Sequence, residues 1–200
     1  MQVRVIAAGV SLVFATTACA TAQPRGAAAP PTPTAPATAA DTWQDQAAPA
    51  EPQAQVGTPA SPCPMPFTFD TPAGWTPTPG DAESRDGLSA TCTVTGPPTT
   101  LRAWVGSDPG STPRGALERF IQGEGKITDP EYRESPVGRS TGVELTFAHP
   151  DTPGARSRAF AVATPLRTLV VSLNAPTPEA YQQALPAYLL AKQSLTPTER

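Results

Sequence analysis

Residues 88–106 read LSATCTVTGPPTTLRAWVG, and this stretch decides the fold. Apolar and polar side chains alternate along both halves, with the period of two that is typical of a half-buried β-strand. Gly-Pro-Pro at 96–98 interrupts the alternation, as a turn sequence does. The stretch therefore predicts two strands, Leu88–Thr95 and Thr99–Gly106, joined as an antiparallel hairpin.

The residues on either side of this hairpin predict a further strand and a helix. Upstream, residues 66–70 (PFTFD) alternate as a strand that stops at the turn sequence TPAG, 71–74. Downstream, Thr112 and Pro113 form an N-cap and a first-turn proline, which begin a helix that we expect to reach Gln122. Its apolar side chains lie three and four residues apart on one face, at Leu117, Phe120 and Ile121.

The C-terminal half predicts more strands and a final helix. The candidate strands are Tyr132–Gly138, Thr141–Ala148, Ser157–Thr164 and Leu166–Leu173. Thr177-Pro178 repeats the helix-start signature, and the helix should reach about Ser194 with Pro186 kinking it or dividing it in two. Its apolar stripe, which we interpret as core, is Tyr181, Leu185, Tyr188 and Leu189. The fold class is therefore α+β, an antiparallel sheet of about six to seven strands with two packed helices.

The N-terminus carries an export signal. Arg4 precedes the apolar run Val5–Phe14, which is shorter than the ~20 residues that a membrane-spanning helix needs. Residues 15–19 read ATTAC, which resembles a bacterial lipobox. That resemblance implies a lipoprotein signal peptide over 1–18 and a Cys19 that carries diacylglyceryl and palmitate groups on the extracytoplasmic side of the cell membrane. Ordinary signal peptidase is the open alternative, because residues 18–20 and 20–22 also fit its small-x-small pattern.

Residues 19–62 predict a tether between this signal and one folded domain, 63–200. They are rich in Ala, Pro and Thr, and such a segment buries too little apolar surface to offset the entropy of ordering. Trp43 is read as an exposed residue or as a short docking motif, and Thr-Pro steps such as Thr32-Pro33 are candidate O-glycosylation sites. A wall-spanning spacer or adhesin, with its function in the tether, is one open alternative.

The chain contains three cysteines, so at least one of them has no intramolecular disulfide partner, and an unpaired reactive thiol is unusual in an oxidising compartment. If Cys19 is lipidated, Cys63 and Cys92 remain as one pair. A disulfide between them would close a loop worth roughly 3–4 kcal/mol in the chain-entropy model. Two buried free thiols are the alternative, whereas a redox role is disfavoured because no Cys-x-x-Cys spacing occurs.

The charge of the chain and the motifs it contains disfavour several classes of function. The net charge is −3 with mixed signs, so no basic face favours nucleic acid. His149 is the only histidine, and a Ser-His-Asp hydrolase would have to use it with a spatially adjacent serine. We interpret His149 as a solvent-facing turn residue, because no Gly-x-Ser-x-Gly elbow occurs. One histidine and a paired set of thiols predict no metal site and no cofactor.

Three remaining features have structural interpretations beside functional ones. Gly123-Glu124-Gly125-Lys126 follows a helix with the wrong spacing for a phosphate loop, so it is read as a helix end. Three acidic residues lie around Arg133 in the sequence: Asp129, Glu131 and Glu134. We predict that they belong to a solvated loop that binds a cation at most weakly. Trp75 and Trp104 are read as core aromatics or as lining of an apolar ligand pocket.

A family resemblance covers roughly Phe67 to Leu195. Its sharp motif is Phe67-x-Phe69-x-x-Pro72-x-Gly74-Trp75, followed by the Thr-Pro helix, the meander and the closing helix. This layout resembles actinobacterial lipoproteins of the LpqN/LpqT type, which have the Mog1/PsbP-like α/β/α sandwich. The cysteine pair framing the first hairpin departs from that pattern. The resemblance implies a non-enzymatic binding or scaffolding role toward an envelope protein, a lipid or a cell-wall component, with no oligomeric state indicated.

Overall fold

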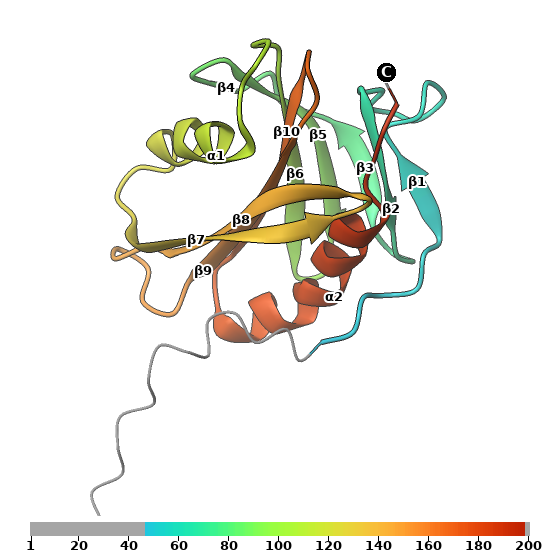
Figure 1. Cartoon of the computed structure of the whole chain (residues 1–200). Helices are drawn as coiled ribbons and strands as arrows, with labels where there is room; N and C mark the ends of the chain where they lie inside the picture. The colour runs from blue at the N-terminus through green and yellow to red at the C-terminus, as the bar shows by residue number, and fades with distance from the viewer. Residues whose placement is uncertain (1–46, 199–200) are drawn as a thin grey trace, which may run out of the picture. The chain divides into compact units, whose positions relative to one another are not determined.

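The computed structural model describes residues 47–198, whose arrangement is shown in Figure 1. The predicted signal peptide, Cys19, Trp43 and Thr32-Pro33 lie outside these residues. In chain order the described elements are β1 (Ala54–Val56), β2 (Phe67–Thr71), β3 (Thr76–Pro79), β4 (Ser84–Arg85), β5 (Leu88–Gly96), β6 (Thr99–Gly106), α1 (Pro113–Gln122), β7 (Thr128–Val137), β8 (Ser140–Ala148), β9 (Arg156–Ala163), β10 (Thr168–Ala175), α2 (Pro178–Ser194) and β11 (Thr196–Pro197).

The strands form two antiparallel sheets. The 8-stranded sheet has the order β3-β5-β6-β10-β9-β8-β7, with β4 paired to β5, and the 3-stranded sheet has the order β1-β2-β11. The hairpin predicted from residues 88–106 is present as β5 and β6, closed by the pair Gly96 and Thr99. An antiparallel α+β fold with two helices is thus confirmed, whereas the predicted sheet of six to seven strands was too small.

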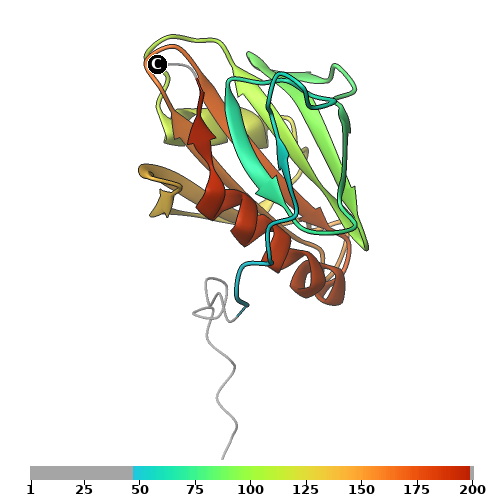
Figure 2. The ribbon, with the colours of Figure 1, turned by 90° about the vertical axis from the view of Figure 1, so that its right-hand side faces the viewer.

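The two helices lie on opposite faces of the large sheet, and alternation along the strands explains how. On β10, Leu169, Val171 and Leu173 belong to the core that contains α2 and β2. Val170, between them, belongs to the core that contains α1. Because successive strand residues point to opposite faces, the sheet is buried on both sides. Figure 2 shows α2 and the small sheet in front of the large sheet and α1 behind it.

Both helices begin at the predicted Thr-Pro signatures. Thr112 Oγ1 accepts a hydrogen bond from the Gly115 amide at 3.0 Å, and Thr177 Oγ1 accepts one from the Ala180 amide at 3.2 Å. The expectation that Pro186 divides the last helix in two is wrong, because α2 continues through it to Ser194. Buried residues on both sides of this proline press α2 onto the sheet, and this packing offsets the lost backbone hydrogen bond.

The domain begins earlier than Cys63. β1 lies inside the stretch assigned to the tether, and its Val56 pairs with Phe69 of β2. β7 also begins at Thr128 rather than at Tyr132. The sequence did not predict β1, β3, β4 or β11. These strands are short, so pairing with a neighbour rather than a local pattern makes them strands.

The predicted Cys63–Cys92 disulfide is present, with a Cα–Cα distance of 5.5 Å. Both cysteines are buried in the core on the α2 side. The bond joins the segment before β2 to the middle of β5, so it ties the small sheet to the large one. No helix in the described part of the chain is long and apolar enough to cross a membrane.

Candidate functional site

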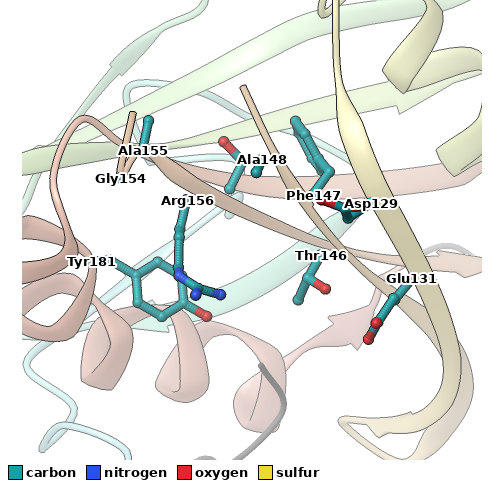
Figure 3. Close-up of a pocket in the computed structure, with 10 residues that line it drawn as sticks. Asp129, Glu131, Thr146, Phe147, Ala148, Gly154, Ala155, Arg156 and Tyr181 are labelled. Carbon is teal, nitrogen blue, oxygen red and sulfur yellow. The ribbon is translucent and has the colours of Figure 1, made fainter. Parts of the chain in front are cut away.

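A cavity of about 380 Å³ opens between the start of β7, the ends of β8 and β9, and the first turn of α2. Its polar lining residues are Asp129, Glu131, Thr146, Arg156, Ser157 and Tyr181, and all but Ser157 are labelled in Figure 3. The volume lies in the range of roughly 300–1,000 Å³ that is usual for small-molecule pockets. It is therefore the best candidate for a binding site among the residues that the structure describes.

A β-bulge places two carboxylates at one side of this cavity. The β7–β8 register shifts between Thr128 and Glu131, and Asp129 inside the bulge has the positive φ of 52°. Bulges re-aim side chains and are frequent beside functional sites. The prediction of a solvated acidic loop was therefore wrong, because Asp129, Glu131 and Glu134 are residues of a paired strand.

Thr146, on the floor of the cavity, has an unusual hydroxyl. The residue is 4% exposed, and its Oγ1 has no hydrogen-bond partner in the structure. A buried hydroxyl without a partner costs free energy, since the bond it made to water is not replaced. The protein therefore presents an unused donor and acceptor to whatever occupies the cavity.

A buried ionic cluster lies beside the cavity, on the same face of the sheet, and centres on Glu144. This carboxylate is 0% exposed and accepts hydrogen bonds from four side chains of three elements. The donors are Arg158 Nε at 2.7 Å, Lys192 Nζ at 2.8 Å, Arg133 Nη2 at 2.9 Å and the Tyr188 hydroxyl at 3.0 Å. The cluster joins β7, β8 and β9 to the last turns of α2.

The protonation states in the cluster follow from these contacts. Burial alone would raise the pKa of Glu144, but the charges and hydrogen bonds of Arg158 and Lys192 outweigh it and lower the pKa to about 2. Burial and the Glu144 carboxylate raise the pKa of Tyr188 well above its ordinary value. Glu144 is thus ionised and Tyr188 protonated at neutral pH, which is the combination that the observed hydrogen bond requires.

Tyr181 links this cluster to the cavity. Arg158 Nη1 donates a hydrogen bond to the Tyr181 hydroxyl at 3.4 Å, and the same tyrosine lines the cavity. The predicted apolar stripe of α2 is buried as expected. Sequence reasoning nevertheless missed the polar role of its tyrosines and the whole of the Glu144 cluster. The available signal was a charged residue within the apolar strand sequence VELTF, 143–147.

His149 has a partner, contrary to the prediction of a solvent-facing residue. Its Nε2 lies 3.1 Å from Ser157 Oγ, and its ring packs edge-on against Phe147 at 5.3 Å. Phe147 belongs to the core on the α1 side, and both Phe147 and Ser157 are among the residues that line the cavity. Ser157 is only 1% exposed, and no carboxylate of the described residues bonds to His149. The arrangement supplies two members of a triad with the serine hidden from solvent.

Trp75 and Trp104 both pack against the protein itself. Trp104 is fully buried, its Nε1 donates to Ser172 Oγ at 3.3 Å, and the guanidinium groups of Arg85 and Arg102 cover its ring at 4.3 and 4.5 Å. Trp75 is partly buried against the core on the α2 side. Neither lines the cavity described above.

The glycine segment after α1 is a helix end, as predicted. The Gly123 amide donates to the Phe120 carbonyl at 3.2 Å, and Gly125 has a φ of +76°. Among the described residues, no group of three or more acidic, histidine or cysteine side chains is arranged to hold a metal ion.

Comparison with known families adds to this geometry. Residues 33–195 match the model of a family described as uncharacterised lipoprotein. The chain belongs to this lipoprotein family. The match confirms the prediction of a lipoprotein, whereas the narrower assignment to the LpqN/LpqT type stays a prediction. A comparison with curated proteins finds no sequence match.

Solved structures include a similar protein. The cyanobacterial PsbP (CyanoP) of Synechocystis aligns with a TM-score of 0.48 and 12% sequence identity. The alignment covers 66% of this chain and 86% of that one.

Proposed function

We propose that this chain is a lipoprotein anchored through Cys19 on the extracytoplasmic side of the cell membrane, where its folded domain binds a small envelope component without catalysis. The observation that carries the proposal is the match of most of the chain to a lipoprotein family, in a sequence with a lipobox-like motif at Cys19. Two acyl chains hold a protein on a bilayer at ~0.8 kcal/mol per buried CH₂, so no basic patch is needed beside them.

The anchor is tested by a single substitution. Cys19→Ala should move the protein from the membrane fraction to the soluble extracytoplasmic fraction and abolish labelling by radioactive palmitate, because no other cysteine lies beside a signal sequence. The double variant Cys63→Ala, Cys92→Ala is the control: it removes the other two cysteines together but leaves the motif and Cys19 intact, so it should retain the palmitate label. Membrane retention of the Cys19→Ala protein would refute the anchor.

The binding role is supported by the cavity beside Tyr181. It combines a buried hydroxyl that lacks a partner with charged side chains of both signs. The Glu144 cluster fixes α2 against β7, β8 and β9, so the elements around the cavity are held before any ligand arrives. Such preorganisation lowers the entropic cost of binding.

The contact between His149 and Ser157 favours a second candidate function, a hydrolase. We expect that a fluorophosphonate probe, which labels nucleophilic serines, will not label the native protein, because Ser157 is 1% exposed. Mass spectrometry of the treated protein checks this. Labelling that disappears in Ser157→Ala, but persists in the control Ser172→Ala, would establish the hydrolase instead.

A further inference from the structure

We propose that the cavity beside Tyr181 binds a small zwitterion, an amino acid or a dipeptide with a free ammonium and a free carboxylate group. The inference rests on the proposed binding role and names the ligand class. It follows from the placement of charge around the cavity, from the hydroxyl on its floor and from its size.

Opposite charges occupy opposite sides of the cavity. Figure 3 shows Arg156 and Tyr181 on one side of Thr146, and Asp129 and Glu131 on the other. The Arg156 guanidinium makes no hydrogen bond or ion pair with the described residues. A guanidinium favours a carboxylate, to which it can donate two parallel hydrogen bonds, and the acidic side favours an ammonium group. A ligand with both groups would be complementary in charge to both sides at once.

The floor of the cavity fits the same ligand. The unpartnered Thr146 hydroxyl can accept from an ammonium group or donate to a carboxylate. On the basic side, the hydrogen bond from Arg158 holds the Tyr181 phenol in place beside Arg156. A ligand in this position would give the Thr146 hydroxyl the partner that the protein does not supply.

The other ligand classes fit less well. A purely cationic ligand would leave Arg156 unmatched, and a purely anionic one would meet Asp129 and Glu131. A neutral sugar could make hydrogen bonds to Arg156 and to the carboxylates, but it would bring no opposite charge to either side of the cavity. A volume of about 380 Å³ is near the lower end of ligand pockets, which suits an amino acid or a dipeptide.

The first experiment identifies the ligand class. The full chain, purified in detergent, is dialysed against an equimolar mixture of amino acids, all dipeptides and common neutral sugars, and bound compounds are measured by mass spectrometry. We expect enrichment of one or a few zwitterions. The N-acetyl and C-amide forms of an enriched compound should each bind about tenfold or more weakly, because each loses one charged group. Absence of an enriched zwitterion, enrichment of sugars alone, or equal binding of the blocked forms would overturn the proposal.

Matched variants locate the ligand. Thr146→Val and Arg156→Gln should each weaken binding about tenfold. Thr168→Val is the control, because Thr168 Oγ1 is also buried without a partner but Thr168 does not line the cavity. Both valine variants should keep the wild-type melting temperature or exceed it. Unchanged ligand affinity in Thr146→Val and Arg156→Gln would refute the site. The fractionation result for Cys19→Ala does not depend on this measurement, so failure of the binding site and failure of the anchor can be told apart.

Discussion

Replacing Glu144 by glutamine should lower the free energy of unfolding by about 3–5 kcal/mol, the usual cost of removing one partner from a buried ionic cluster. Glutamine nearly preserves the shape of the side chain but leaves Arg158 and Lys192 without the carboxylate that they both contact. Because Lys192 belongs to α2 and Arg158 to β9, the loss should loosen the attachment of the last helix to the sheet.

Urea unfolding followed by circular dichroism measures this loss. Glu118→Gln is the matched control: Glu118 pairs with Arg114 on the exposed face of α1, with the two side chains 50% and 59% exposed. That control should change stability by less than about 0.5 kcal/mol. Equal, small effects of the two substitutions would show that the Glu144 cluster contributes little to folding.

The free energy of unfolding should depend on pH through the ionisation of the Glu144 carboxylate. The pKa of Glu144 is lowered from 4.5 to about 2 in the folded protein. A depressed folded-state pKa stabilises the protein above the unfolded-state value, and this contribution is lost as the pH falls from about 5 toward 2. The wild-type protein should therefore lose stability more steeply over this interval than Glu144→Gln. Parallel profiles would contradict the assignment.

Removing the disulfide is expected to cost roughly 3–4 kcal/mol, because the loop of 29 residues that it closes then gains conformational freedom in the unfolded chain. The change is Cys63→Ala together with Cys92→Ala. Both positions are buried, so lost packing adds to the effect.

The measurement compares urea midpoints with and without a thiol reductant. It is made in a full chain that carries Cys19→Ala, so that no third thiol can exchange with the pair. Reductant should lower the stability of the chain with Cys63 and Cys92 toward that of the double variant, and it should leave the double variant unchanged. A parent chain that is insensitive to complete reduction would show that the bond does not stabilise the domain.

Local signals account for the parts of the fold that were predicted well. The strand Thr99–Gly106 and the helix Pro113–Gln122 have the predicted bounds, because strict alternation and a Thr-Pro cap act within a few residues. β1 and β3 have no such signal. β3 reads TPTP, a sequence that is disfavoured in strands, and it forms one only at the edge of the sheet beside β5.

The candidate site was missed for a related reason. Along β8, Gly142, Glu144 and Thr146 occupy one face and look like the solvent side of an amphipathic strand. In the structure α2 covers this face, so the carboxylate becomes buried and acquires its cations from β7, β9 and α2. The cavity is likewise assembled from residues far apart in the chain, from Asp129 to Tyr181.

The sequence by itself determined the lipoprotein character, the hairpin, both helix starts and the choice of cysteines for the disulfide, because each depends on neighbouring residues or on simple counting. Only the tertiary structure decided that Glu144 is buried, that Thr146 lacks a partner and that opposite charges face each other across the cavity. Burial and hydrogen-bond satisfaction depend on which distant element covers a face, and a period-two pattern does not distinguish water from a helix on that face.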